Sequence, residues 1–313
     1  MNFSALFFTM LKLMIILALG WAGHRSGLFP EETQKVLTTV VLYVTAPCSI
    51  IYSALAATEL PPVGMVLRLL GLSFLCYAVL IVLAFPLLKL LRIPQGARGV
   101  YLSLMVFSNC LFIGLPVTQS VFGSDALLYL AVFSLPFYPA MYILGVYLMI
   151  RDRQSADAAA QRQRIPLKSI INPCLIAGII AILLVIVRFR SPQVITELFA
   201  MVNNVTTPCA LFVNGIAIAR QPLKRMLGNV RVYAVSLVRL VLFPVVVWLL
   251  LRPFVSEALI MGVALIVHAM PAAAAIPMLA IEYGSDRDSA VQGVFITTIC
   301  CLITIPLLLG ALV

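Results

Sequence analysis

The chain has 313 residues, of which 63% are hydrophobic and 10% are charged, and its formal net charge is +10. Soluble domains contain roughly 45–50% apolar and about 25% charged residues, so this composition excludes a water-soluble globule. The positive charge lies in short loops and not on a domain with base-reading elements, which excludes a nucleic-acid-binding protein.

Apolar runs of about 20 residues with few charges are typical of membrane-spanning helices. The first run has no basic start and is interrupted by Lys12, so we interpret it as a retained helix and not as a signal peptide. The predicted fold class is all-α integral membrane, with ten transmembrane helices. They are expected at residues 4–23, 36–56, 65–88, 100–122, 127–150, 169–187, 197–218, 231–251, 256–281 and 289–312.

Basic residues concentrate in the loops that follow the first, third, fifth, seventh and ninth runs. If the runs alternate across the membrane, all of these loops lie on one face. The positive-inside rule makes that face cytoplasmic, so both termini are expected outside the cytoplasm.

Two passages recur at one spacing. Val44–Cys48 reads V-T-A-P-C and Val205–Cys209 reads V-T-T-P-C, an offset of 161 positions (47 to 208). Pro116–Asp125 and Pro277–Asp286 both end in G-S-D at the same offset (116 to 277). We therefore predict two copies of one unit.

The hydrophilic stretch that begins at Arg151 separates five runs from five. We predict a first five-helix repeat at 1–150, a cytoplasmic linker at 151–168 and a second repeat at 169–313. Because five is odd, the second copy enters the membrane from the opposite side, and such inverted repeats are common in secondary transporters.

The fourth run of each copy carries the strongest irregularity. One contains Asn109, Gly114 and Pro116, and the other contains Pro271 and Pro277. Proline in a helix interior removes a hydrogen bond, and a broken helix is tolerated only beside protein or a watery cavity. The alternative is a simple packing kink, since proline is frequent in membrane helices. Recurrence in both halves favours a transporter site, where half-helix N-termini attract an anion.

Ionisable side chains inside membrane spans are candidates for function, and three occur here. Lys12 is interpreted as structural, because its stem can reach the surface. Arg239 lies roughly 12 Å into its span, where it either anchors a substrate carboxylate or pairs with carbonyls at a helix break. His268 either binds substrate and changes protonation during transport, or is a satisfied structural group.

Neutral polar residues complete the candidate site, with Asn109 before the break of the fourth run and Asn214 in the seventh. All acidic residues fall in loops or at span ends, so the core offers no carboxylate for sodium or for a cationic substrate. This pattern favours an anionic substrate, with protons as the expected coupling ion.

Neither a metal site nor a cofactor site is expected, because the seven cysteines show no C-x-x-C spacing. H-E-x-x-H and G-x-S-x-G are also absent from the sequence, so an enzyme is not expected.

Several motifs together resemble the auxin efflux carrier family, which includes plant PIN-type carriers and bacterial permeases for malate or malonate. They are S-N-C-L-F-I-G-L-P at Ser108–Pro116, Asn172-Pro173, Ile266–Ala269 leading to Pro277, and Glu282–Gly284. The resemblance implies a fold similar to bile-acid symporters and sodium/proton antiporters, with the fourth and ninth spans crossing at the substrate site. It also implies a homodimer.

The chain departs from the plant pattern at Ser108, where plant carriers have proline, and at His268, where they have glutamine. Pro271 also comes one position early. These departures indicate a bacterial member in the inner membrane and argue against auxin itself as the substrate. The predicted function is a secondary carrier of a small organic anion, a mono- or dicarboxylate, working by alternating access. A channel or a non-transporting membrane sensor of organic acids remains the alternative.

Overall fold

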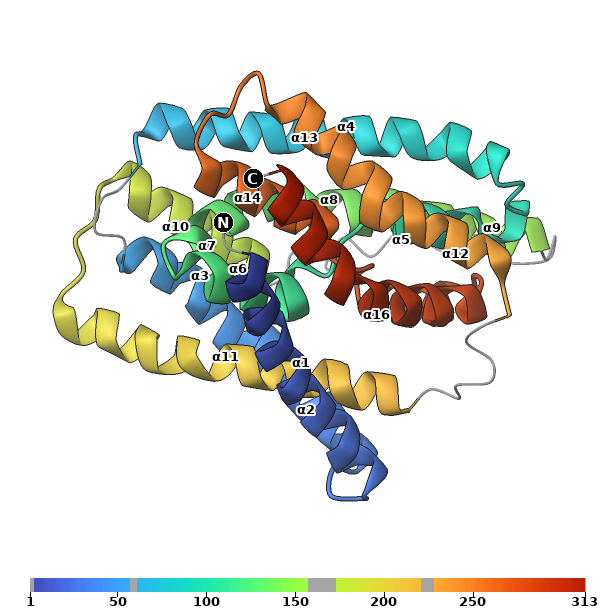
Figure 1. Cartoon of the computed structure of the whole chain (residues 1–313), viewed down its shortest axis with the longest axis horizontal. Helices are drawn as coiled ribbons and strands as arrows, with labels where there is room; N and C mark the ends of the chain where they lie inside the picture. The colour runs from blue at the N-terminus through green and yellow to red at the C-terminus, as the bar shows by residue number, and fades with distance from the viewer. Residues whose placement is uncertain (1–2, 57–60, 157–172, 221–227, 313) are drawn as a thin grey trace.

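The computed structural model describes residues 3–56, 61–156, 173–220 and 228–312, and its named elements are all helical (Figure 1). The first half contains α1 (Phe3–Arg25), α2 (Glu31–Val40), η1 (Val41–Thr45), α3 (Ala46–Leu55), α4 (Val63–Leu90), η2 (Gln95–Ala97), α5 (Arg98–Val106), η3 (Cys110–Gly114), α6 (Leu115–Phe122), α7 (Ala126–Ser134), α8 (Phe137–Pro139), η4 (Ala140–Gly145) and α9 (Val146–Ala156). The second half contains α10 (Pro173–Ile186), α11 (Gln193–Ala219), α12 (Val230–Leu237), η7 (Val238–Leu242), α13 (Phe243–Leu251), α14 (Ala258–Ala269), α15 (Ile276–Tyr283) and α16 (Arg287–Leu312).

Six helical stretches within the described residues are long and apolar enough to cross a membrane. They are Glu32–Leu55, Val63–Leu90, Ala126–Arg153, Gln193–Ala219, Val230–Leu251 and Arg287–Leu312. The prediction of an all-helical integral membrane protein is therefore confirmed. Each of the ten apolar runs coincides with helical segments, whereas their number of membrane crossings stays a prediction. Of the expected linker, 151–156 belongs to α9, and 157–168 lies outside the described residues.

Wide π-helical turns precede three of the prolines. η1 ends before Pro47, η3 before Pro116 and η7 before Pro244. A proline has no N–H for the carbonyl four residues earlier, so the preceding turn adjusts its hydrogen bonding. A proline therefore follows three of the four π-helical turns that the described residues form.

The helices pack in two groups. The first, called the α11 group, consists of α1, α2 with α3, α10 and α11, which contact one another extensively. The second, called the crossover group, contains the remaining helices, in which α14 contacts α7, α13 and α16 while α5 contacts α4 and α9. Figure 1 shows α11 along one edge of the molecule and α4 along the other, with the short helices between them.

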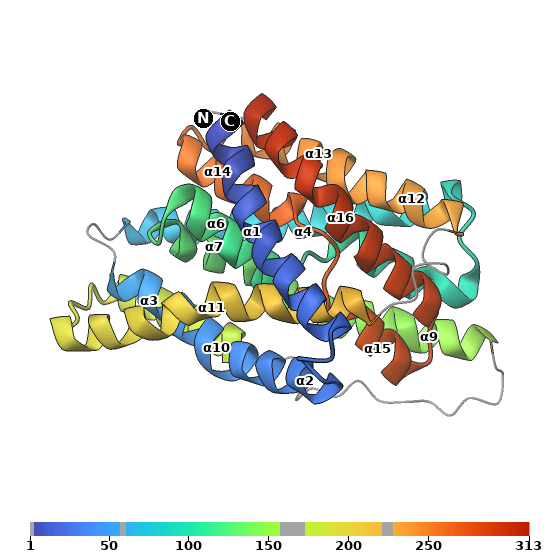
Figure 2. The same cartoon turned by 60° about the horizontal axis from the view of Figure 1, so that its bottom comes forward.

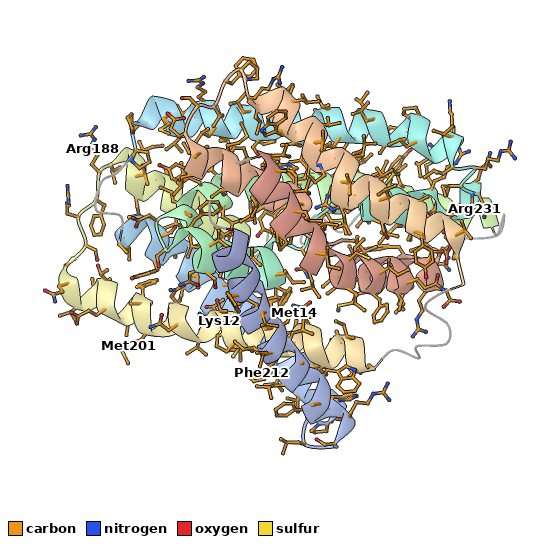
Figure 3. The ribbon with its side chains drawn as sticks, in the orientation of Figure 1. Lys12, Met14, Arg188, Met201, Phe212 and Arg231 are labelled. Carbon is orange, nitrogen blue, oxygen red and sulfur yellow. The ribbon has the colours of Figure 1, made fainter. Side chains whose placement is uncertain are left out.

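Close approach of α1 and α11 depends on glycine. A Cβ on Gly215 would lie 2.1 Å from the carbonyl oxygen of Leu17, and a Cβ on Gly20 would lie 2.8 Å from that of Phe212. Small residues of this kind let membrane helices pack backbone to backbone. Lys12 is exposed on α1 (Figure 3), and its structural role stays a prediction.

Two glycines at the 161-residue offset share one backbone role. Gly123 ends α6 with φ 83° and Gly284 ends α15 with φ 71°. Glycine is favoured there because positive φ brings no Cβ clash. The two ends of the chain also lie close together (Figure 2).

Candidate functional site

Two interrupted helices cross at the centre of the crossover group. The chain is extended between α5 and η3 and again between α14 and α15, and an antiparallel bridge pairs Ser108 with Ala272. The backbone N–H of Asn109 donates to the Pro271 carbonyl at 2.8 Å, and that of Ala273 donates to the Phe107 carbonyl at 2.9 Å. The crossing therefore satisfies backbone groups that cannot be left facing lipid.

The prolines of the repeated passages lie just after these interruptions. Pro277 stands in the first turn of α15, where a missing N–H costs little. Pro116 follows directly after the π-helical turn η3 of the same half-helix, so its missing N–H leaves the Phe112 carbonyl without a helical donor. Pro271 lies within the second interruption itself. The structure therefore places the breaks a few residues earlier than Pro116 and Pro277.

Asn109 caps the half-helix that begins at η3. Its Oδ1 accepts a hydrogen bond from the backbone N–H of Phe112 at 3.1 Å. Its Nδ2 donates to Oδ1 of Asn214 on α11 at 3.4 Å. Both asparagines are buried, with exposed fractions of 3% and 5%. The two predicted amides thus meet where the crossover group faces the α11 group.

Pro116 and Pro271 each leave one backbone carbonyl without its helical donor, and a side chain donates to that carbonyl instead. Pro116 cannot donate to the Phe112 carbonyl, which accepts from Nδ2 of Asn214 at 3.3 Å. Pro271 likewise cannot donate to the Val267 carbonyl, which accepts from the Cys110 thiol at 3.8 Å. The polar side chains near the crossing are therefore partners of interrupted backbone.

Arg239 is fully buried and binds the ends of both interrupted helices. Nε donates to the Met270 carbonyl at 2.9 Å, and Nη1 donates to the carbonyls of Met105 and Val106 at 3.1 and 2.9 Å. A helix C-terminus carries about half a negative charge, so the ends of α5 and α14 together offset one guanidinium. Of the two roles expected for Arg239, the geometry shows the carbonyl pairing.

This placement of charge affects the opposite helix ends. Arg239 neutralises the C-termini of α5 and α14. The positive N-termini of α15 and of the half-helix formed by η3 and α6 therefore dominate the electrostatic potential at the crossing. Among residues whose burial is described, the only buried carboxylate is Asp152, held by the backbone N–H of Gly99 and the hydroxyl of Ser285 near the start of α5. The crossing therefore suits an anionic group.

His268 lies one turn before the second break and is fully buried. Its Nδ1 is 2.8 Å from the Ala264 carbonyl oxygen, and its ring packs 5.3 Å from the ring of Tyr77. Within the described part of the chain, Nε2 has no hydrogen-bond partner. The imidazole is therefore only half satisfied.

A small cavity of about 20 Å³ adjoins the first break, between the two groups. That volume holds a single water-sized molecule. Cys110 and Ser134 supply polar atoms, and the Ser134 hydroxyl has no partner among the described residues. The remaining lining residues are Ile50, Leu115, Leu130, Ala131, Leu135, Tyr138, Cys174 and Gly178.

The other predicted residues occupy defined positions. A Cβ on Gly114 would lie 3.3 Å from Met270 Cγ, so glycine permits the two breaks to approach. Pro277 is half-buried in the first turn of α15. Sequence reasoning missed Tyr77, Ser134 and Thr297. The Thr297 hydroxyl accepts a hydrogen bond from the backbone N–H of Ala272 at 3.1 Å. None of the three carries a formal charge or belongs to a repeated passage, so the sequence held no signal for them.

Comparison with known proteins agrees with this architecture. A family model described as membrane transport protein matches residues 5–309. The chain is 25% identical over 301 residues to an uncharacterized transporter of Methanocaldococcus jannaschii, covering 95% of this chain and 96% of that protein. It is 22% identical over 307 residues to a protein of Rhizobium meliloti provisionally named malonate transporter, covering 94% and 92%. The chain therefore belongs to the membrane transport protein family, in agreement with its resemblance to the auxin efflux carriers.

Proposed function

We propose that this transporter is a secondary carrier of a small organic anion that binds at the crossing of the two interrupted helices. The observation that carries the proposal is the arrangement of helix ends: Arg239 binds the C-terminal ends, and the N-terminal ends face the crossing without a carboxylate nearby. Fixed N–H dipoles of this kind favour negative charge.

The substrate class follows from the same surroundings. Asn109 and Asn214 offer amide groups beside the first break, and the cavity next to it has the Ser134 hydroxyl in a mostly apolar wall. Such a site suits a mono- or dicarboxylate such as malate, malonate or an auxin-like acid. The name of the Rhizobium meliloti relative is consistent with a dicarboxylate.

Alternating access supplies the transport cycle. A cavity with room for one water must widen before it can admit a carboxylic acid, and its wall belongs to both helix groups. We propose that movement of the crossover group against the α11 group opens it to each side in turn. The proposed architecture has ten spans in two inverted five-helix repeats, 1–150 and 169–313. Transporters built from inverted repeats move one helix bundle against the other in this way.

The orientation belongs to the same proposal. The matching glycines and prolines at the 161-residue offset support the inverted duplication, and the neighbouring chain ends support an even number of crossings. With basic loops inside, both termini lie outside the cytoplasm in a bacterial inner membrane. A homodimer is part of the proposal only by analogy with the family's relatives.

Uptake and counterflow in proteoliposomes test this function. The purified protein is reconstituted and supplied with labelled acetate, butyrate, malonate, malate and indole-3-acetate. A carrier shows saturable uptake of at least one acid, and that acid inside the vesicle accelerates entry of the label. Linear, non-saturating flux without counterflow indicates a channel, and no flux of any organic anion contradicts the proposal.

A further inference from the structure

The hydrogen bond of His268 fixes which ring nitrogen can receive a proton. Its Nδ1 lies 2.8 Å from the Ala264 carbonyl oxygen, which can only accept, so Nδ1 carries the hydrogen. A neutral imidazole has one N–H, which leaves a lone pair on Nε2. Nε2 is buried and has no partner in the described part of the chain. It is an open proton-accepting position.

Residues beside His268 reach the cavity. Tyr77 packs on the His268 ring, with the ring centroids 5.3 Å apart. The Cys110 thiol donates at 3.8 Å to the carbonyl of Val267, the residue before His268, and Cys110 and Ser134 both line the cavity. The hydroxyls of Tyr77, Ser108 and Ser134 have no hydrogen-bond partner among the described residues.

The charges around His268 are unbalanced. Arg239 on η7 donates to the carbonyl of Met270, two residues after His268, while Tyr77 on α4 packs on the imidazole ring and Cys110 on η3 contacts the neighbouring Val267 carbonyl. α6, α7 and α13, which surround α14, contain no acidic or basic residue. The charged residues of α16, Arg287 and Asp288, lie in its first turn. A proton on Nε2 would therefore add a second positive charge beside Arg239 without a carboxylate to balance it.

We propose that Nε2 of His268 is the proton-binding site of this carrier and that it is protonated only together with anion binding. The inference rests on the proposed anion transport. A carboxylate in the cavity offsets the positive charge, so anion and proton strengthen each other's binding by the same factor. The proton enters from water on the open side, resides on Nε2 and leaves to water on the other side.

Histidine NMR tests the assignment directly, because the chain has only two histidines, His24 and His268. The His24→Gln variant, labelled with nitrogen-15 histidine, shows one imidazole. Without ligand it is expected as the neutral tautomer with hydrogen on Nδ1. With saturating amounts of the acid that gave the fastest counterflow, the imidazolium signal appears at a higher pH than without it. Hydrogen on Nε2 in the neutral form, or protonation unaffected by the acid, overturns the proposal.

Proton flux tests the consequence. Vesicles containing a trapped pH dye are given the same acid under an inward proton gradient. His268→Gln is expected to lose gradient-driven accumulation and acidification while keeping counterflow, and His24→Gln is the matched control. If His268→Gln does not fold, the nitrogen-15 signal of His268 in the His24→Gln variant still tests the assignment.

The outcomes separate the two proposals. If no acid is exchanged by the unaltered protein, anion transport itself is wrong. If an acid is exchanged but moves no proton, or if His268→Gln still accumulates it under the gradient, the proton site is wrong and anion transport stands.

Discussion

The side-chain amide of Asn214 donates a hydrogen bond to the carbonyl oxygen of Phe112 at 3.3 Å. This carbonyl is the one that Pro116, four residues later, leaves without its helical donor. Nδ2 of Asn214 also donates to the Ala210 carbonyl at 2.8 Å within α11. Pro116 in the crossover group thus leaves a carbonyl acceptor through which Asn214 of the α11 group contacts the crossover group.

This relationship predicts that Pro116 and Asn214 act as a unit. Pro116→Ala restores an N–H that competes for the Phe112 carbonyl, and Asn214→Ala removes the outside donor. Each change is expected to slow uptake, and the double variant is expected to be no slower than the worse single one. Residues in one hydrogen-bond network show interaction energies of about 0.5–3 kcal/mol.

Initial rates of counterflow for the two single variants and the double variant measure the coupling. Asn204→Ala is the matched control, because Asn204 lies on the same helix and is exposed. Fully additive effects would show that Pro116 and the Asn214 amide act independently.

Much of the architecture could be predicted from the sequence because membrane solvation imposes simple rules. Long apolar runs must be helical, since lipid offers no partner for the backbone. The paired prolines correctly indicated interrupted helices in the fourth run of each copy. The exact positions of the breaks were not predicted, because Pro277 is accepted in the first turn of α15 and Pro116 is accommodated by the π-helical turn before it.

The roles of single polar residues were harder to predict. Arg239 suited either a substrate or a helix end, and only its distances to three carbonyls show the second role. Cys110 and Ser134 look like ordinary small packing residues, and their place at the cavity depends on contacts between helices far apart in the chain. Such contacts leave no periodic pattern in a single sequence.

Asn109 combines a structural and an electrostatic role that two substitutions can separate. Asn109→Ala loses the cap on Phe112, which costs about 1 kcal/mol of stability. Asn109→Asp keeps an oxygen for that cap but adds negative charge at the crossing. Asn109→Asp loses the Nδ2 hydrogen bond to Asn214, so we expect both variants to melt below the unaltered protein and Asn109→Asp to lose anion uptake more completely than Asn109→Ala.

Melting in detergent and uptake in proteoliposomes, measured on the same preparations, check this expectation. Full uptake by Asn109→Asp would mean that no anion approaches the crossing.

Arg239 is expected to be needed for folding more than for substrate recognition. Arg239→Gln loses a charge that binds three carbonyls, and hydrogen bonds to charged groups contribute about 1.5–3 kcal/mol each. The variant should therefore melt well below the unaltered protein, with Arg239→Lys in between. Arg231→Gln, at an exposed position on α12, is the control (Figure 3). A normal melting temperature with abolished uptake would instead make Arg239 a substrate anchor.

The packing of α1 on α11 predicts opposite effects for two glycine substitutions. In Gly215→Ala the new methyl would lie 2.1 Å from the Leu17 carbonyl oxygen and 2.8 Å from the Trp21 nitrogen, both backbone atoms that cannot rotate away. Overpacking of this kind typically costs about 1–3 kcal/mol. In Gly71→Ala, within α4, no atom lies within 4 Å of the new methyl, and alanine favours helix by up to about 1 kcal/mol. Thermal unfolding should therefore shift down for Gly215→Ala and stay level or rise for Gly71→Ala. Equal shifts would show that the close approach of α1 and α11 at Gly215 contributes little to stability.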